Sequence, residues 1–365
     1  MLGLFFVEIF FRIFWQPEPA TNQTGLEALV VFDSKLETRY QKNAAAVVQS
    51  PHGEFEIKYL TNDIGLRDGK DFSKKKKISR ILAVGNSFVE GWGVSEANRF
   101  TDVAEEYFNE GAKIKIDIVN AGISGYGVLQ SYLFLKEIYS VIEPNHVMFF
   151  YMSTMSLADA RYERIADFDD DGFVTGLDVD YLLSGANSSK LANEDKIPEF
   201  FSELAEFSHT AKYLMRRYQN RLLIADLKRG DLASDLFATL RNGAEAEYRE
   251  KTYDHILKMR DFVRSKGVRF TLVYLPTPLQ VSTSEWNKGK LPYQFTESNF
   301  EGNERIVRAF CRDNTLSCLF PTSELQNLAN IGHKKLFFEY DFHLNVEGNK
   351  ALGVWLGNHL TEILE

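Results

Sequence analysis

Five short apolar segments have the length and composition of buried strands, and segments with helical periodicity lie between them. The predicted strands cover residues 80–84, 115–120, 146–151, 270–275 and 317–320, and the predicted helices cover 95–109, 128–141, 244–266, 303–313 and 346–364. This alternation favours an α/β protein, in which helices cover both faces of a five-stranded, mainly parallel sheet as a three-layer α/β/α sandwich. Functional groups of such a fold lie at the carboxyl ends of its strands.

Two long segments fall outside this alternation. Residues 25–78 carry little helical periodicity, and an alternating pattern at 54–60 predicts that they form an N-terminal β-rich extension. Residues 157–242 form an insertion with helical segments such as 200–226, and a connection of this length predicts a lid or a functional loop region. The main domain is therefore expected to span residues 79–365, with this insertion inside it.

The first residues of the chain are apolar from 2 to 15 except for Glu8 and Arg12, and a polar stretch follows. An apolar run of this length is too short to cross a bilayer, which needs about 20 residues. Three interpretations of this run are possible: the end of a membrane anchor, a signal-like segment or an interfacial helix. A helix of the protein core is the alternative to all three. Because no small-residue cleavage site follows the run, we favour an anchor or partial transmembrane segment and linker over residues 1–24.

Composition and charge exclude several classes of protein. Of the 365 residues, 44% are hydrophobic and 25% are charged, which fits neither a disordered chain nor a polytopic membrane protein. The net charge of −9 argues against nucleic acid as a partner. Cys311 and Cys318 flank a predicted helix-to-strand turn, where a disulfide or two packed thiols would fit equally well. No Cys/His cluster indicates zinc.

A serine stands at the end of the first predicted strand. Ser87 follows the apolar run and Gly85, which permits a tight turn, so its hydroxyl and backbone N–H are expected at the functional edge of the sheet. This is the position of a nucleophile, although a serine there can also cap a helix. Trp92, a short way along, is expected to pack in the core, with the wall of a substrate pocket as the alternative.

A histidine near the end of the chain makes the catalytic interpretation stronger. His343 lies just before the last predicted helix, and Asp341 precedes it by two residues. An imidazole can take the proton of a serine hydroxyl near neutral pH, and a carboxylate on its other nitrogen fixes the tautomer. A glycine-rich turn at 120–127 can add backbone N–H groups that stabilise an oxyanion, unless it is a plain loop.

These segments, in this order, resemble the sequence blocks of the SGNH (GDSL-like) hydrolase superfamily, in its bacterial branch with an N-terminal anchor. The matching segments are 85–88, 120–127 and 341–343, and the resemblance runs from about residue 59 to residue 364. It implies a flavodoxin-like fold and a serine esterase activity.

The resemblance also implies a role for each residue. Ser87 would be the nucleophile and, through its backbone N–H, the first oxyanion donor. Gly125 would be the second donor, His343 the base and Asp341 the acid that orients it.

Two positions depart from the family pattern. Asn86 stands where aspartate is commoner, at a side chain that carries no proton in the mechanism. The family usually has Gly-Asn-Asp after the third strand, whereas residues 151–156 of this chain read Tyr-Met-Ser-Thr-Met-Ser. The loss of one oxyanion donor lowers turnover about 100- to 1,000-fold in a well-studied protease. Catalysis by this protein could therefore be weakened, redirected or absent. A hydroxyl of Thr154 or Ser153 is the candidate replacement.

An acidic motif lies within the predicted insertion. It has glycine at position 6, and its carboxylates at positions 1, 3, 5 and 12 match an EF-hand calcium loop: Asp167, Asp169, Asp171 and Asp178. The motif resembles a dockerin-type loop and would give calcium a structural role. The alternative is an acidic β-turn between short strands.

Together these features predict a serine-dependent hydrolase of carboxylic esters that works through an acyl-enzyme and requires no cofactor. The expected substrate is an acylated small molecule or a glycan, such as a carbohydrate O-acetyl ester. A membrane-anchored protein with a periplasmic or extracellular catalytic domain would meet such esters. The alternatives are a polysaccharide O-acyltransferase and a non-catalytic SGNH-like binding module. The sequence does not determine the oligomeric state.

Overall fold

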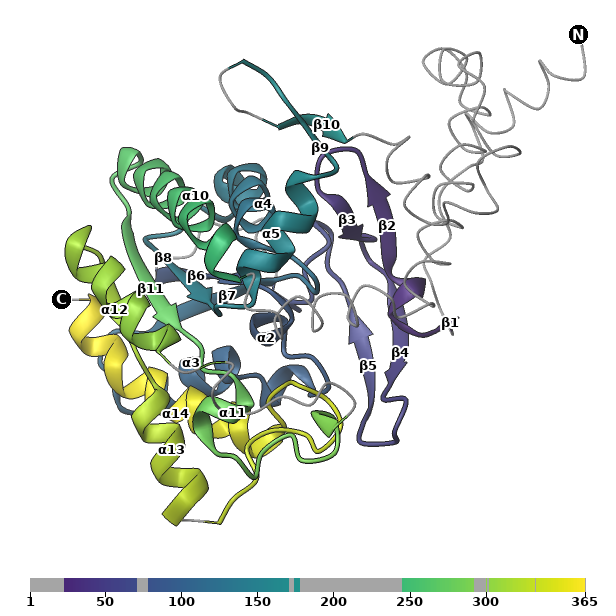
Figure 1. The fold of residues 1–365 in the computed structure, drawn as a ribbon, viewed down its shortest axis with the longest axis vertical. Helices are drawn as coiled ribbons and strands as arrows, with labels where there is room; N and C mark the ends of the chain where they lie inside the picture. The colour runs from purple at the N-terminus through teal and green to yellow at the C-terminus, as the bar shows by residue number, and fades with distance from the viewer. Residues whose placement is uncertain are drawn as a thin grey trace, which may run out of the picture.

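The chain folds around one parallel β-sheet (Figure 1). The computed structural model describes residues 23–70, 78–170, 174–177, 245–291, 300, 302–331 and 333–364. The sheet strands are β6 (Ser79–Gly85), β7 (Ile116–Gly122), β8 (His146–Tyr151), β11 (Arg269–Tyr274) and β12 (Ser317–Leu319). They lie in the order β12-β11-β8-β6-β7 and all neighbours are parallel. This is the flavodoxin-like order, and the predicted fold class is confirmed.

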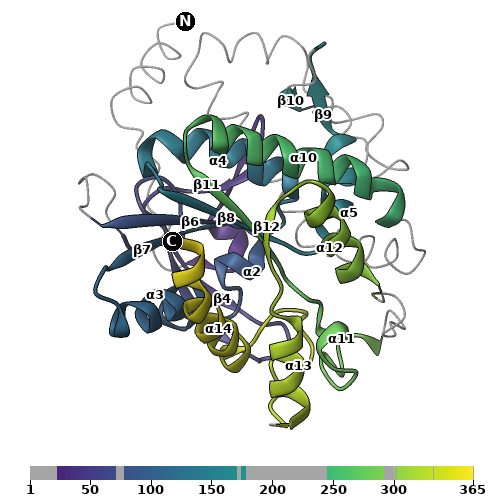
Figure 2. The same ribbon diagram turned by 90° about the vertical axis from the view of Figure 1, so that its left-hand side faces the viewer.

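Helices cover both faces of the sheet (Figures 1 and 2). One face carries a tightly packed pair, α3 (Phe100–Gly111) and α14 (Val346–Leu364), with α13 (Thr322–Ile331) beside α14. The opposite face carries α4 (Val128–Ile142), α5 (Met155–Glu163) and α10 (Glu245–Ser265). Further helical elements of this domain are α2 (Ser87–Glu90), η2 (Glu96–Asn98), α11 (Pro278–Val281) and α12 (Asn303–Asp313).

Most of these elements occur where the apolar pattern predicts them. An exception is the single helix predicted at 95–109, which is divided into η2 and α3. The division occurs because Arg99 has an extended backbone, with ψ of 144°. Helices α5 and α13 have no counterpart among the predicted elements.

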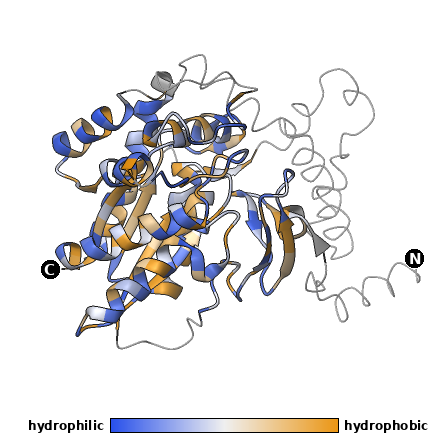
Figure 3. Cartoon of the chain, turned by 90° about the horizontal axis from the view of Figure 1, so that it is seen from below, coloured by the Kyte–Doolittle hydropathy of each residue, from blue (hydrophilic) through white to orange (hydrophobic). Residues whose placement is uncertain are grey.

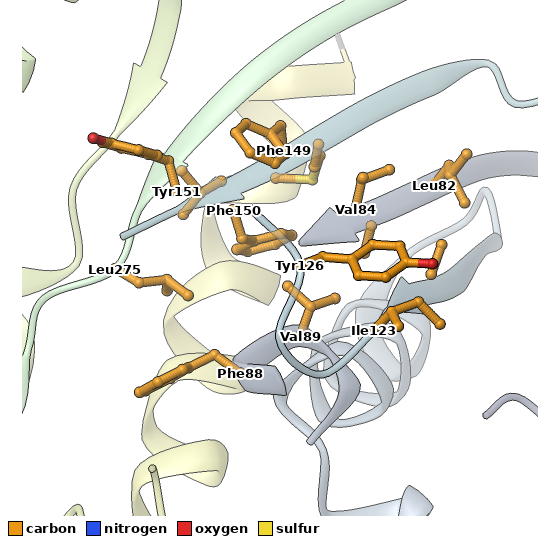
Figure 4. Close-up of a cluster of buried hydrophobic side chains, with 14 of the residues drawn as sticks. Leu82, Val84, Phe88, Val89, Ile123, Tyr126, Phe149, Phe150, Tyr151 and Leu275 are labelled. Atoms are coloured by element: carbon orange, nitrogen blue, oxygen red, sulfur yellow. The ribbon is translucent and has the colours of Figure 1, made fainter. Parts of the chain in front are cut away.

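The central strands are buried on both faces, which explains their continuous apolar runs. Figure 4 shows how Val84 of β6 and Phe150 of β8 gather with Phe88 and Val89 of α2. The hydropathy colouring shows the same concentration of apolar residues in the sheet layer (Figure 3). Gly122 allows α2 to approach β7, because a Cβ at this position would lie 2.1 Å from the Glu90 nitrogen.

The residues before the central sheet form short strands that pack on the main domain (Figure 1). A three-stranded sheet contains β1 (Gln23–Thr24), β4 (Ala45–Gln49) and β5 (Glu56–Leu60), and an antiparallel hairpin contains β2 (Val30–Asp33) and β3 (Glu37–Tyr40). A 3₁₀ turn, η1 (Leu26–Ala28), links the first two strands. The buried side chains of this region and those of the central sheet belong to one continuous hydrophobic cluster.

Several predicted features lie outside the described residues. These are residues 1–22 of the predicted anchor and linker, and residues 178–242 of the predicted insertion, including the helix predicted at 200–226. Within the described ranges, no helix is long and apolar enough to cross a membrane. The choice between a disulfide and free thiols is decided, because Cys311 in α12 is bonded to Cys318 in β12.

Candidate active site

Ser87 lies at the carboxyl end of β6, where the sheet has its topological switch point. Strand β6 lies between β7 and β8, so the connections that leave it and its neighbours diverge at this edge. In open α/β sheets, ligands bind at such a point. Ser87 is the first residue of α2, and the Asn86 side chain caps this helix by accepting the Phe88 N–H at 3.1 Å. Asn86 therefore performs a capping role that an aspartate could also perform.

Glycine is needed at position 85 for a reason other than the tight turn that the sequence predicts. Gly85 is not among the glycines with positive φ, so its backbone conformation is open to other residues. A Cβ at this position would lie 2.5 Å from the Val89 Cγ2 atom. Glycine is thus needed because α2 folds back closely on the end of β6.

The structure brings the three residues of the candidate triad together. Ser87 Oγ lies 2.6 Å from His343 Nε2, and His343 Nδ1 lies 2.5 Å from Asp341 Oδ1. The same Asp341 oxygen accepts the backbone N–H of His343 at 3.0 Å. The His343 and Asp341 side chains are each 20% exposed, so the pair is sheltered but reachable. This arrangement can move a proton from the serine hydroxyl to the imidazole while the carboxylate holds the ring.

The second carboxylate oxygen of Asp341 accepts the Nε1–H of Trp92 at 2.9 Å. The indole packs against Phe55 and Tyr59, as the sequence interpretation expects, but its hydrogen bond to Asp341 was not predicted. Burial raises the pKa of Asp341, and this effect is outweighed by the charge of His343 and the hydrogen bonds from His343 and Trp92. The pKa of Asp341 therefore lies below its ordinary value, which keeps the group ionised at neutral pH.

The glycine-rich loop after β7 is tied to the nucleophile helix through Glu90. The fully buried Glu90 carboxylate accepts the hydroxyls of Ser124 at 2.6 Å and Tyr40 at 2.8 Å, and burial raises its pKa. Ile123 N–H also donates to the carbonyl of Gly85 at 3.1 Å. These bonds tie the two residues before Gly125 to the end of β6 and to α2. The role of Gly125 as second oxyanion donor stays a prediction.

Sequence reasoning did not identify Glu90. One signal was present: Glu90 is a carboxylate between apolar neighbours, three residues after Ser87. A charged residue at a core position normally needs a specific partner, and here the partners are hydroxyl groups from two other segments.

The loop after β8 contains both candidates for the third oxyanion donor. Ser153 is buried, and its hydroxyl accepts the Asn303 side-chain N–H at 3.1 Å, so it is held toward the start of α12. Thr154 is also buried and lies at the N-cap position of α5, where its side chain makes no capping hydrogen bond. Thr154 is therefore the candidate whose hydroxyl is not committed to the helix end, and its assignment as a donor stays a prediction.

A buried carboxylate fixes the far end of the glycine-rich loop. Asp159 of α5 accepts the N–H of Leu129, at the start of α4, at 2.9 Å and the Thr252 hydroxyl at 2.9 Å. A Cβ on Gly127 would lie 2.2 Å from the same carboxylate, so glycine is required for this approach. Burial raises the pKa of Asp159 to about 6.

This raised pKa predicts a pH-dependent contribution of Asp159 to stability. The folded state favours the protonated carboxyl of Asp159, which adds to the free energy of unfolding. This addition is complete below the ordinary pKa of 3.8 and is lost as the pH rises through about 6. The amide of an Asp159→Asn variant cannot ionise, so the stability of this variant relative to wild type should increase by about 3 kcal/mol between about pH 3.5 and pH 7.5. Urea unfolding at both pH values measures this difference.

The other ionisable groups are the same in both proteins, so their effects on the free energy of unfolding largely cancel in the comparison. Asp261→Asn, at an exposed carboxylate on α10, is the matched control and should show no such pH dependence. A stability difference for Asp159→Asn that is equal at both pH values would contradict the prediction.

The described part of the acidic motif forms an antiparallel hairpin of β9 (Ala166–Phe168) and β10 (Val174–Leu177). Asp167 lies in β9, whereas an EF-hand loop begins at the end of a helix. Asp169 directly follows β9, and Asp171 and Asp178 lie outside the described residues. Within the described segments, no group of three or more His, Cys, Asp or Glu residues could hold a metal ion. Calcium binding by this motif stays a prediction.

Neither a protein-family model nor the sequence of a curated protein matches the chain. Among solved structures, the chain is similar to a lipolytic protein of the G-D-S-L family from Desulfitobacterium hafniense, with 14% identity, a TM-score of 0.41, and coverage of 77% of this chain and 98% of the other. It is also similar to the lipase/acylhydrolase from Enterococcus faecalis, with 11% identity, a TM-score of 0.41, and coverage of 78% and 97%. A third similar structure is that of the psychrotrophic esterase EstA from Pseudoalteromonas sp., with 11% identity, a TM-score of 0.38, and coverage of 78% of this chain and 98% of the other.

Proposed function

We propose that the protein is a serine-dependent hydrolase of carboxylic esters. The observation that supports this function is the hydrogen-bonded series from Ser87 Oγ through the His343 ring to the Asp341 carboxylate, with distances of 2.6 and 2.5 Å. A nucleophile, a base and an orienting acid in this order are what acyl transfer through a covalent intermediate requires.

In the proposed reaction, Ser87 Oγ attacks the carbonyl carbon of the ester while His343 Nε2 accepts the hydroxyl proton. The negative charge on the former carbonyl oxygen is stabilised by the backbone N–H groups of Ser87 and Gly125, with Thr154 as the proposed third donor. The C–O bond to the alcohol then breaks, and the alcohol leaves with the proton from His343. The product of this half is an acyl-enzyme on Ser87.

Water completes the reaction by attacking the acyl-enzyme carbonyl as His343 accepts its proton. Collapse of the second tetrahedral intermediate returns the proton to Ser87 Oγ and releases the carboxylic acid. Asp341 stays ionised throughout and stabilises the imidazolium that forms in each half. Every proton in this sequence moves between substrate, water and protein groups, so the mechanism requires no cofactor.

We further propose that the substrate carries an O-acyl group on a small molecule or a glycan, with carbohydrate O-acetyl esters as the first class to test. This choice goes with a membrane-anchored protein whose catalytic domain is periplasmic or extracellular. The Cys311–Cys318 disulfide supports that location, because disulfides persist mainly in oxidising compartments.

A fluorophosphonate probe tests the acyl-enzyme directly, because it bonds covalently to an activated serine oxygen. We expect one adduct per folded chain, located by peptide mass analysis on Ser87, and no adduct in His343→Ala or in heat-unfolded protein. Wild-type protein that is folded but unlabelled, and that does not cleave a short-chain aryl ester, would overturn the proposal and favour the binding-module alternative.

Hydrolysis and acyl transfer to a polysaccharide share this intermediate and differ in the group that resolves it. Incubation of the protein with an ester whose acyl group is labelled, with and without a glycan acceptor, separates the two reactions. A hydrolase releases the free acid in both cases, whereas a transferase yields acylated glycan when the acceptor is present.

A further inference from the structure

The segment that carries Asp341 has no regular secondary structure, so its backbone polar groups need partners from elsewhere. Three consecutive N–H groups of this segment share one carboxylate, that of Glu54. Glu54 Oε1 accepts the N–H of Glu339 at 2.7 Å and of Tyr340 at 3.1 Å. Its Oε2 accepts the N–H of Asp341 at 3.1 Å. Glu54 lies between β4 and β5, in the N-terminal extension, 287 positions before Asp341.

The carbonyl groups of the same segment are held by the main domain. The Glu339 carbonyl accepts the N–H groups of Lys288 and Gly289, each at 2.9 Å. The Tyr340 carbonyl accepts the Trp286 Nε1–H at 2.8 Å. The segment is therefore held from two sides, and the side that bears the Asp341 N–H is held by the extension.

Aromatic contacts place the Glu54 loop against the same site. The Phe55 ring lies edge-on to Trp92 with centroids 5.8 Å apart, and Trp92 is the residue that donates to Asp341 Oδ2. His52 stacks on Tyr340 with centroids 4.2 Å apart. The extension thus reaches Asp341 by two routes. Glu54 binds the backbone of Asp341, and Phe55 packs on Trp92, which binds the side chain of Asp341.

We propose that Glu54 is a positioning residue for the catalytic acid, and that the N-terminal extension is therefore part of the active site. This inference rests on the proposed function. Hydrogen bonds to an ionised carboxylate are stronger than neutral ones, so three of them set the position of the Asp341 backbone and, with it, the carboxylate that orients His343. Small displacements of catalytic groups are costly, since a misplacement of about 1 Å can reduce a rate about 100-fold.

Glu54→Gln is the most informative variant, because it keeps the shape of the side chain. An amide has one acceptor oxygen, and its other end is a donor, so at least one of the three N–H groups then faces another N–H. We expect kcat for a short-chain aryl ester to fall roughly 10- to 100-fold, with KM nearly unchanged. Rates are expressed per active site, titrated with the fluorophosphonate probe, so that any unfolded fraction is removed from the comparison.

Glu56→Gln is the matched control, since this exposed glutamate of β5 accepts only a side-chain bond from Gln49 at 2.7 Å among its described contacts. It should retain wild-type kcat. Glu54→Asp keeps the charge, but its side chain is too short to reach all three N–H groups. Its kcat should lie between those of Glu54→Gln and wild type. It serves as the second variant if Glu54→Gln folds poorly.

The outcomes separate the two proposals. A wild-type protein without labelling or esterase activity would refute the proposed function itself. Active wild type together with Glu54 variants whose kcat per titrated site equals that of Glu56→Gln would refute the positioning role, even if their thermal stability is lower. A selective loss of kcat in the Glu54 variants, graded as described, supports it.

Discussion

Replacing Ser87 by alanine is expected to lower the hydrolysis of a short-chain aryl ester by at least about 10⁴-fold in kcat. The hydroxyl oxygen that is removed is the atom 2.6 Å from His343 Nε2, and no acyl-enzyme can form without it. The fold should be unaffected, because residue 87 is the first residue of α2 and alanine is a good helix former. Steady-state kinetics on both proteins measure the difference, with circular dichroism and thermal unfolding as checks of the fold.

Ser95→Ala provides the matched control for this prediction. Ser95 precedes η2, and its hydroxyl accepts a bond from Asn98 at 2.9 Å. This variant loses a serine hydroxyl at another helix start and should keep the wild-type rate. Equal rates for wild type and Ser87→Ala would show that any observed hydrolysis takes place without this serine.

Asp341→Asn is expected to lower kcat by about 10⁴-fold, the size of the effect measured for the equivalent change in a serine protease. The structure provides a specific reason. Three donors surround the carboxylate: the Nδ1–H and backbone N–H of His343 on one oxygen, and the Trp92 Nε1–H on the other. An asparagine amide must turn its NH₂ group toward one side, so it conflicts with at least one of these donors.

If the NH₂ group faces His343, the ring must carry its proton on Nε2 and cannot accept the Ser87 proton. If it faces Trp92, two N–H groups oppose each other. Trp92→Phe removes that opposition, so the double variant Trp92→Phe/Asp341→Asn should recover part of the activity lost in Asp341→Asn alone. Kinetics of the two single variants and the double variant measure this coupling.

Trp92→Phe by itself should cost far less than Asp341→Asn, because the bond between Asp341 Oδ1 and His343 Nδ1 remains. A double variant no more active than Asp341→Asn would show that Trp92 does not decide the orientation of the amide. An Asp341→Asn variant with near wild-type kcat would exclude Asp341 as the orienting acid.

The fold was predictable from the sequence because its signals are local. The strands of a parallel sheet covered on both faces are continuous apolar runs, and the five runs correspond to β6, β7, β8, β11 and β12. The order of strands and helices then leaves few arrangements, since connections between parallel strands are right-handed and short. The division of one predicted helix into η2 and α3 depends on the backbone of a single residue, Arg99, which no periodicity reveals.

The chemical groups of the candidate site were also predictable, but their supporting contacts were not. Ser87, Asp341 and His343 have side chains whose chemistry is specific enough to single them out at the ends of predicted elements. Glu54 has no such signal, because it is one glutamate in a polar hairpin loop. Trp92 and Glu90 are close to Ser87 in the sequence, yet their partners, Asp341 and Tyr40, come from distant segments.

The sequence by itself therefore determined the α/β class, the positions of the strands along the chain and the identity of the nucleophile, base and acid candidates, since each depends on local periodicity or on residue type. Only the tertiary structure decided that Ser87 meets His343, that the two cysteines are bonded, and that Glu54 holds the Asp341 segment. For the two hydrogen-bonded pairs, the physical reason is that partners more than 250 positions apart are chosen by the packing of whole elements. A buried or half-buried polar group must find its partner among whatever that packing brings within reach.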